Sequence, residues 1–409
     1  MAAYDITTAN SALEFDTQDY SYGSICAIDA NHFAVTWHSY VAGDFGKAQI
    51  LTANTSTWAV TTGNAVLTFA TTSGNNNACA LIDSTHFINI YREESEHGYS
   101  QVFTVNTTTW AITTSAAKFE FLNGSTADNS HNLYKFDTNH FVIGFSPTST
   151  EDPTVQVLTV NTTNWTITTA GASKTYAAEG GDGHPSFYPI DATHFINFFK
   201  GENSDSYAEV FDVNTTTWAI TTAAAALTIL EGNNLGNSCY KIDTNHFINY
   251  FSNANTTAQA VVVTINTTTW AVTTANSLFV FDTQHSDYAP TCSQIDSNHF
   301  IAFWGIIDND GGVQSFTVNT STWAITTAAA LLEFDTQNGL QDVCYKIDTS
   351  HFINVWQGVG SDGFTQVFTV ELAAAGPANL KSYNTNLKAN IKTICTNAIA
   401  NTKTLNTNS

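Results

Sequence analysis

Short apolar runs recur through the chain and are separated by polar turns rich in Asn, Asp and Thr. One unit reads CYKI at 239–242, HFINYF at 246–251, AVVVTI at 260–265 and WAVTT at 270–274. These runs are rich in β-branched and aromatic residues, and helical periodicity is absent from the first 370 residues. In HFINYF both sets of alternating positions are largely apolar, which predicts a strand buried on both faces, as in a sheet packed between two others.

This unit occurs seven times. An Asp-x-x-His-Phe motif marks every copy, and its histidines lie 52 to 54 residues apart: His32, His86, His140, His194, His246, His299 and His351. An Asn-Thr-rich turn that ends in Trp marks six copies: Trp58, Trp110, Trp165, Trp218, Trp270 and Trp323. A period of just over 50 residues with four short strands indicates a repeat architecture.

The seventh copy ends after its third strand, without a Trp turn. The chain, however, opens with YDITTANSALEFDTQ at 4–18, which matches WAITTAAALLEFDTQ at 323–337 in ten of fifteen positions. We therefore predict an all-β, seven-bladed β-propeller of four-stranded blades in which the N-terminal strand completes the last blade. Such closure removes the exposed sheet edges.

The repeat resembles seven-bladed propellers of the kelch and WD-repeat kind over residues 1–371, because a tight turn ending in Trp joins the third and fourth strands. The double glycine that kelch repeats carry after the second strand is absent. The resemblance implies architecture only, because propellers carry many functions. The turn also resembles the Asp-box turn of sialidases, but those enzymes use three arginines and this chain has one, Arg92.

Charged residues make up only 11% of the 409 residues, and the formal net charge is −23. An acidic, arginine-poor surface repels phosphate backbones, so we expect no nucleic-acid partner. No apolar run is long enough to span a membrane, and the first ten residues lack a signal-peptide pattern. The composition is typical of secreted or viral surface proteins. We therefore expect an extracellular or virion location, reached by a route other than a visible leader, with a cytoplasmic location as the alternative.

Five cysteines lie just before the Asp of the repeated motif: Cys26, Cys79, Cys239, Cys292 and Cys344. Equivalent positions in successive blades are expected to lie too far apart for a disulfide. Leu133 and Phe187 occupy the same position in the other two copies, so we predict a small apolar slot filled by buried thiols. Metal or disulfide chemistry is the alternative.

The repeated histidines and tryptophans are expected to be structural. Each His should form hydrogen bonds within its own blade, and each turn Trp should pack against a neighbouring blade. The six Asn-Thr-Ser/Thr sequences also match glycosylation sequons, but Asn and Thr favour this turn for conformational reasons.

The antiparallel strand order predicts two unlike faces. The near-uniform turns between strands 1 and 2 and between strands 3 and 4 share one face, which we call the turn face. The dissimilar connections between strands 2 and 3 and between blades share the opposite face, which we call the loop face. Binding residues concentrate on loops held by a rigid frame, so we place the binding site on the loop face.

An aromatic residue ends the second strand of every blade: Trp37, Tyr91, Phe145, Phe199, Phe251, Trp304 and Trp356. The three Trp residues belong to blades 6, 7 and 1, which are neighbours in a closed propeller. Trp37, Tyr91, Trp304 and Trp356 are therefore candidate residues for stacking on a sugar, and packing between blades is the alternative.

The segment DNDGG offers a candidate calcium site through Asp308 and Asp310, because calcium prefers clustered oxygen ligands. It lacks a full EF-hand loop, and a simple acidic turn is the alternative. We otherwise expect no cofactor. No nucleophile, phosphate-loop or paired-carboxylate motif occurs, so we expect binding and not catalysis.

Residues 372–409 form a separate C-terminal tail. From residue 376 on, the sequence contains no acid, four lysines and an eleven-residue repeat. As a helix, this repeat would form a nearly straight or right-handed coiled coil, which predicts a homo-oligomer through residues 380–405; a disordered tail is the alternative. The tail is similar to the Asn/Thr-rich ends of phage-like fibre proteins.

Together these features predict a non-catalytic adhesion module that recognises a surface glycan or protein as part of a viral appendage or extracellular assembly. The alternatives are a carbohydrate-active hydrolase or lyase on the same scaffold, and a purely structural decoration protein.

Overall fold

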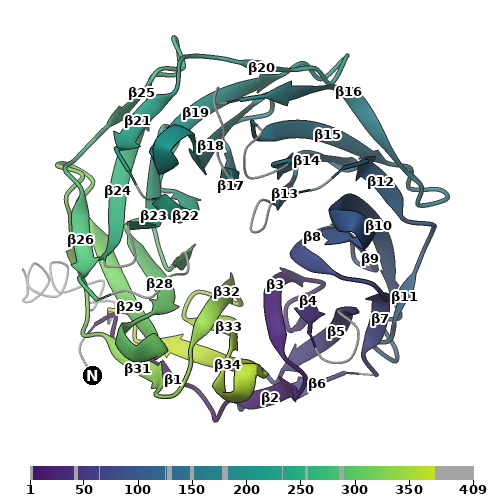
Figure 1. The fold of residues 1–409 in the computed structure, drawn as a ribbon. Helices are drawn as coiled ribbons and strands as arrows, with labels where there is room; N and C mark the ends of the chain where they lie inside the picture. Colours follow the sequence, from purple (N-terminus) through teal and green to yellow (C-terminus); the bar gives the residue numbers. More distant parts are fainter. Residues whose placement is uncertain are drawn as a thin grey trace, which may run out of the picture. The chain divides into compact units, whose positions relative to one another are not determined.

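Seven antiparallel sheets are arranged as blades around a central axis (Figure 1). In this computed structural model the described residues are 3–40, 45–63, 65–124, 126, 131–147, 152–176, 183–232, 234–253, 257–284 and 290–373. The predicted seven-bladed, all-β propeller is confirmed.

Each blade runs outward from the axis in strand order. The innermost strands are β3 (Tyr20–Ala27), β8 (Asn75–Asp83), β13 (Asn132–Lys135), β17 (Gly183–Pro189), β22 (Asn234–Lys241), β27 (Thr291–Gln294) and β32 (Leu340–Lys346). The second strands are β4 (His32–Ser39), β9 (His86–Glu93), β14 (His140–Phe145), β18 (His194–Lys200), β23 (His246–Asn253), β28 (His299–Gly305) and β33 (His351–Gln357). The third strands are β5 (Phe45–Ala53), β10 (His97–Val105), β15 (Thr154–Val160), β19 (Ser206–Val213), β24 (Thr257–Ile265), β29 (Gly311–Val318) and β34 (Gly363–Val370).

The outer strand is interrupted in six blades, and both of its segments pair with the third strand. The first segments, with the continuous β16 of blade 3, are β6 (Val60–Thr62), β11 (Ile112–Thr114), β16 (Ile167–Thr175), β20 (Ile220–Thr222), β25 (Val272–Thr274), β30 (Ile325–Thr327) and β1 (Ile6–Thr8). The second segments are β7 (Leu67–Ala70), β12 (Phe119–Leu122), β21 (Leu227–Leu230), β26 (Phe279–Asp282), β31 (Leu332–Asp335) and β2 (Leu13–Asp16).

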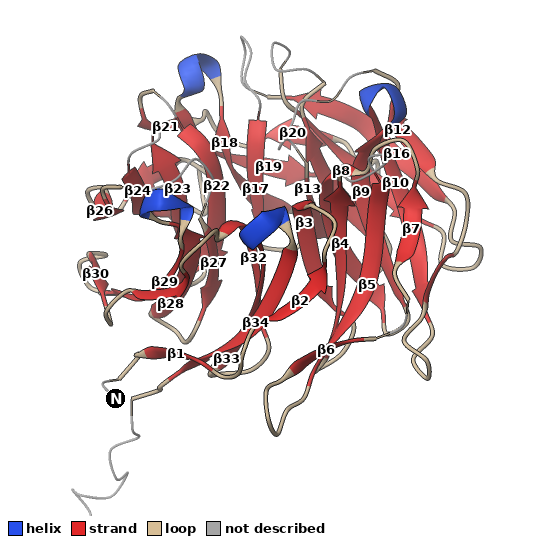
Figure 2. Cartoon of the chain, turned by 60° about the horizontal axis from the view of Figure 1, so that its bottom comes forward, coloured by secondary structure: helices blue, strands red, loops and turns tan. Residues whose placement is uncertain are grey.

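Within the described residues, four connections between the second and third strands form 3-10 turns on the loop face, drawn in blue in Figure 2. They are η1 (Glu94–Glu96), η2 (Glu202–Ser204), η3 (Ile307–Asn309) and η4 (Val359–Ser361).

The N-terminal strand closes the propeller, as predicted. β1 pairs antiparallel with β34 in the register Ile6↔Val370 and Thr8↔Phe368, and β2 continues along the same strand. The first and last strands of the propeller therefore share blade 7. The outer edge of its third strand, β34, is covered by β1 and β2.

The hydrophobic core is divided into seven clusters, each between two adjacent blades. Between blades 1 and 2, for example, Ile50 of β5 packs with Cys79, Phe87 and Phe103 of the next sheet. The second strands are buried on both faces because each blade is covered on two sides. This explains why their sequences are apolar at both alternating sets of positions.

The cysteines occupy the predicted slot of the inner strands, except that Ile25 fills it in blade 1 and Cys26 follows one residue later. All five are free thiols; Cys344 is half-buried and the others are buried. Burial raises the pKa of Cys239 and Cys292 to about 12 in each case, which keeps these thiols protonated.

Met1–Glu371 forms one compact unit. The predictions for the tail, including its oligomerisation through residues 380–405, lie outside the described residues. In the part of the chain that the structure describes, no helix is long and apolar enough to cross a membrane.

Candidate functional site

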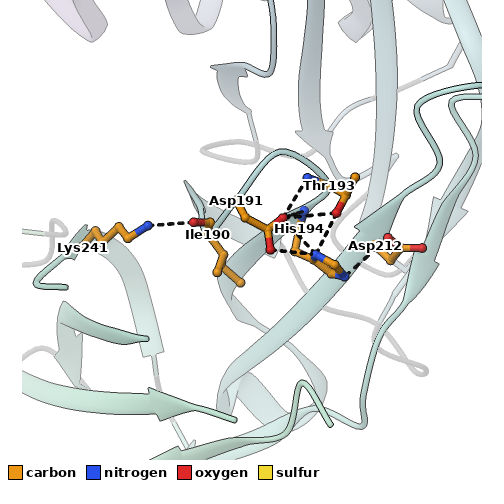
Figure 3. A network of polar contacts seen from close by, with 6 residues as sticks. All are labelled: Ile190, Asp191, Thr193, His194, Asp212 and Lys241. Atoms are coloured by element: carbon orange, nitrogen blue, oxygen red, sulfur yellow. Dashed lines mark hydrogen bonds and ion pairs between the residues drawn. The ribbon is translucent and has the colours of Figure 1, made fainter. Parts of the chain in front are cut away.

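The repeated Asp and His of the turn face form a closed local unit. In blade 4, the Asp191 carboxylate accepts hydrogen bonds from the backbone amides of Thr193 and His194 and lies 3.0 Å from His194 Nδ1 (Figure 3). The same Asp–His contact, at 2.7–3.0 Å, recurs in all seven blades. The prediction that each His bonds within its own blade is confirmed.

Each of these histidines also stacks on an aromatic residue of the next blade. Six stacks use the turn Trp residues, with ring centroids 3.4–3.6 Å apart. Tyr4 makes the seventh stack on His299 at 3.6 Å, and its hydroxyl donates to Asp296 at 2.9 Å. Tyr4 also has the left-handed φ, 66°, that the six Trp residues share at 58–62°. The motif that is missing from blade 7 is thus supplied by a tyrosine at the start of the chain.

These contacts explain why the turn face is uniform. Partial burial alone would raise the pKa of each repeated Asp, but hydrogen bonds from backbone amides and from the neighbouring imidazole outweigh burial and hold each pKa below its usual value. The repeated residues link one blade to the next, and their identity is accounted for by this structural role.

The candidate stacking residues are buried, which favours the alternative of packing between blades over stacking on a sugar. Trp37 and Tyr91 have an exposed fraction of 0%, and Trp304 and Trp356 of 1%. Trp37 and Trp304 lie in the cores between blades and do not present a surface to a sugar.

A second repeated motif explains the burial of the three tryptophans. Phe-Asp-Thr-Gln occurs at 15–18, 281–284 and 334–337, each time about 20 residues before one of them. The indole N–H of Trp304 donates to Asp282 at 2.8 Å, and Phe281 meets its ring edge-on at 4.9 Å. Trp356 bonds to Asp335 at 2.9 Å in the same way, and Trp37 bonds to Asp16.

These contacts form an inter-blade lock, because the Phe and Asp come from the outer strand of the preceding blade. A buried indole N–H needs an acceptor, and this Asp supplies it. The threefold Phe-Asp-Thr-Gln repeat is the sequence signal that could have identified the lock.

The candidate calcium ligands lie in and beside η3, where Asp308 has a left-handed φ of 62°. Among the described residues, no group of three or more His, Cys, Asp or Glu side chains could hold a metal ion. The calcium prediction therefore gains no support from the geometry.

Among the described residues, blades 6, 7 and 1 each expose a large apolar side chain at the same position of the loop that follows the second strand. Ile307 of η3 and Val359 of η4 are 46% and 47% exposed, and Tyr40, at the end of β4, is 46% exposed. Glu94 and Glu202 open the corresponding turns of blades 2 and 4. Three adjacent blades thus carry an apolar sector, which we call the apolar loop sector: Tyr40, Ile307 and Val359.

The inner strands contain β-bulges at their loop-face ends, which the sequence did not reveal. Five bulged positions have positive φ: Tyr22, Asn76, His184, Gly236 and Gln341. Side chains from adjacent blades bond to this backbone: Gln341 Oε1 accepts from the Tyr22 amide at 2.6 Å, and His131 Nδ1 donates to the Asn76 carbonyl at 2.8 Å. The bulges therefore join neighbouring blades beneath the loops.

Asp342 follows one of these bulges and is buried. Its Oδ1 accepts a hydrogen bond from Asn354 Nδ2 at 2.6 Å. The hydrogen bond from Asn354 lowers the pKa of Asp342, but burial and the nearby Asp335 carboxylate outweigh it and raise this pKa to about 7. In blades 2 and 5 the equivalent hydrogen bond is accepted by the side-chain amides of Asn77 and Asn237. Blade 7 therefore has a carboxylic acid, Asp342, where these two blades have an amide.

The sequence matches no family model and no curated protein. Its fold is similar to several solved propellers. A putative 6-phosphogluconolactonase from Bacteroides fragilis has a TM-score of 0.58 at 10% identity, covering 83% of this chain and 95% of that one. Sqt1 from Chaetomium thermophilum has a TM-score of 0.54 at 13% identity, covering 92% and 88%. The K499G mutant of NanB sialidase from Streptococcus pneumoniae has a TM-score of 0.50 at 10% identity, covering 88% and 70%. At these identities the likeness establishes the fold alone.

Proposed function

We propose that this protein is a non-catalytic binding protein that holds a surface glycan or surface protein with the loops of blades 6, 7 and 1. In this proposal it acts as part of a viral appendage or an extracellular surface assembly. The observation that carries the proposal is the contrast between the two faces. The turn face repeats one structural unit seven times, whereas the loop face differs from blade to blade and exposes the apolar loop sector.

The chemistry of this sector supports binding. Isolated exposed apolar residues are common, but here three occupy matched positions of adjacent blades, and in this proposal one partner covers them together. Four polar residues that follow the outer strands β2 and β31 are exposed, and in this proposal they supply hydrogen-bonding groups to the partner: Thr17, Gln18, Thr336 and Gln337.

The test compares three proteins on a glycan array and on panels of cell surfaces. The double variant Ile307→Asp/Val359→Asp places two charges in the apolar loop sector, and we expect its binding to fall at least tenfold, on the order of 1.4 kcal/mol. The control is Val280→Asp, whose side chain is also 46% exposed but lies on the outer strand β26. Equal binding by the double variant and the wild type would refute the proposal.

A further inference from the structure

From blade 3 to blade 7 the inner strands carry tyrosines at one repeated position with one interruption, whereas blades 1 and 2 have Cys26 and Ala80 there. At the position that follows the cysteine slot, blades 3, 4, 5 and 7 have Tyr134, Tyr188, Tyr240 and Tyr345, each paired in register with an apolar residue of the second strand. Blade 6 has Ser293 at this position, between Tyr240 and Tyr345.

Each tyrosine leans towards the next blade and meets the Phe that follows the repeated His there. The ring centroids are 5.7 Å apart for Tyr134 and Phe195, 6.0 Å for Tyr188 and Phe247, 6.2 Å for Tyr240 and Phe300, and 5.8 Å for Tyr345 and Phe33. A tyrosine at position 293 would lean towards Phe352 in the same way. The smaller side chain of Ser293 does not fill the space that a tyrosine ring would occupy at this position.

A cleft of about 400 Å³ lies at this gap. Tyr240, Ser293 and Tyr345 line it beside the axis, and Lys346 and Asp348 line it towards the turn face. This volume is within the range of about 300–1,000 Å³ that is usual for small-molecule sites. The exposed fraction of Tyr345 is 38%, so one aromatic wall is accessible.

The polar groups of the cleft include donors and acceptors. Lys346 Nζ donates one hydrogen bond to the Ile295 carbonyl at 2.8 Å, and an ammonium has three N–H donors. Asp348 and Ser293 bring acceptor oxygens. Sugar hydroxyl groups use both kinds of partner, whereas their C–H faces pack on aromatic rings.

The surrounding charge argues for a neutral ligand. Asp296 and Asp348 are close enough to affect Lys346 electrostatically, and they belong to the seven repeated aspartates of the turn face, all of which have a lowered pKa. These carboxylates are ionised at neutral pH and repel anions.

We infer that this cleft binds a neutral monosaccharide unit between Tyr240 and Tyr345, with Ser293, Lys346 and Asp348 bonding to its hydroxyl groups. The site is separate from the apolar loop sector and does not depend on the function proposed for it.

The test uses the whole chain and five probes: D-glucose, D-galactose, D-mannose, L-fucose and N-acetyl-D-glucosamine. Saturation-transfer NMR and calorimetric titration should detect at least one of them at millimolar concentration. Ser293→Tyr restores the tyrosine of the neighbouring blades, fills the cleft and should abolish binding without lowering the thermal unfolding temperature. Ala80→Tyr adds the same side chain at the equivalent position of blade 2 and should leave binding unchanged.

A second variant guards against a folding defect in Ser293→Tyr. Tyr345→Ala removes the more exposed wall and should weaken binding at least about threefold, the scale of one aromatic contact. Ile307→Asp/Val359→Asp should bind the sugar normally, which separates this site from the loop face. The inference is overturned if none of the five sugars binds the wild type at about 20 mM, or if Ser293→Tyr binds as the wild type does.

Discussion

At the scale of single residues, whether a polar side chain is available to a ligand depends on whether another residue already satisfies its hydrogen bond. Trp304 is not available to a ligand, because its indole N–H is bonded to Asp282 and its ring is packed against Phe281. Both of these partners come from a segment of the preceding blade about 20 residues earlier in the chain.

We predict that Asp282→Ala destabilises the protein by about 1–3 kcal/mol, because it leaves a buried indole N–H without its acceptor. Urea unfolding measures this change. The control is Asp308→Asn, which alters an exposed acid and should be nearly neutral.

The double variant Asp282→Ala/Trp304→Phe isolates the hydrogen bond, because the second change removes the donor. If Asp282→Ala has the same effect with Trp or Phe at position 304, the bond does not contribute to stability.

A second prediction concerns Asp342, whose pKa is raised to about 7 by burial and by Asp335. The native state then holds a proton that the unfolded state releases above its ordinary pKa of 3.8, so stability falls as pH rises from about 4 to about 7. Asp342→Asn, which copies Asn77 and Asn237, should remove this loss. We expect the variant to be more stable than the wild type at pH 8, by at most about 4 kcal/mol at about 1.4 kcal/mol per pKa unit.

Thermal unfolding of both proteins at pH 5 and pH 8 provides the measurement. The advantage of Asp342→Asn should shrink at pH 5, where both side chains are neutral in the native state. An equal advantage at both pH values would show that the acid is not responsible.

At the scale of elements, the strand that closes the propeller is also the strand that supplies the seventh aromatic stack. β1 pairs with β34, and Tyr4 just before it stacks on His299. One short segment thus completes a sheet and links blade 7 to blade 6.

We predict that deleting residues 1–15 destabilises the whole propeller, because it exposes the edge of β34 and removes the stack on His299. A loss of several kcal/mol corresponds to a fall in unfolding temperature of roughly 10 °C, at about 2–4 °C per kcal/mol in large domains. Calorimetry measures the shift. Tyr4→Trp places at this position the residue that the other six blades use, and it should unfold close to the wild type. An unchanged unfolding temperature after the deletion would contradict closure by β1.

At the scale of the whole molecule, the seven Asp–His units make the fold sensitive to acid. Each repeated Asp has a lowered pKa, because hydrogen bonds to its carboxylate outweigh its partial burial. Such a group stabilises the native state above its unfolded pKa, and this contribution is lost as the pH falls through the native pKa. The units are equivalent, so their losses add around the propeller.

We therefore predict that stability falls steeply below about pH 4, the ordinary range of aspartate. Unfolding temperature measured from pH 6 to pH 2 tests this. Asp191→Asn retains an acceptor oxygen but no charge. We expect it to reduce slightly the fall in unfolding temperature below about pH 4, because the other six units still contribute. A stability that stays constant down to pH 2 would show that the repeated carboxylates do not support the fold.

The whole molecule also separates the repeated scaffold from the two surfaces that we propose for binding. The turn face is occupied by contacts that hold the blades together, whereas the apolar loop sector and the cleft at Ser293 break the sevenfold pattern. Both proposed sites depend on departures from the repeat, although the cleft also uses the repeated Asp348.

The sequence by itself determined the number of blades, the closure by residues 4–18, and the structural roles of the repeated His and Trp. These features are local or periodic. A strand buried on both faces, an Asp–His turn and a fifty-residue period each leave a pattern that can be read along the chain.

Only the tertiary structure decided which side chains are accessible. Trp37, Trp304 and Trp356 end their strands beside polar loops, as predicted, but a Phe and an Asp from the preceding blade bury them. Tyr345 is 38% exposed and lines the cleft together with Ser293 of the adjacent blade. The exposure of a side chain depends on which residues of the neighbouring blade pack against it. Such residues are about 20 to 50 positions apart in the sequence, and they meet only when the blades pack together.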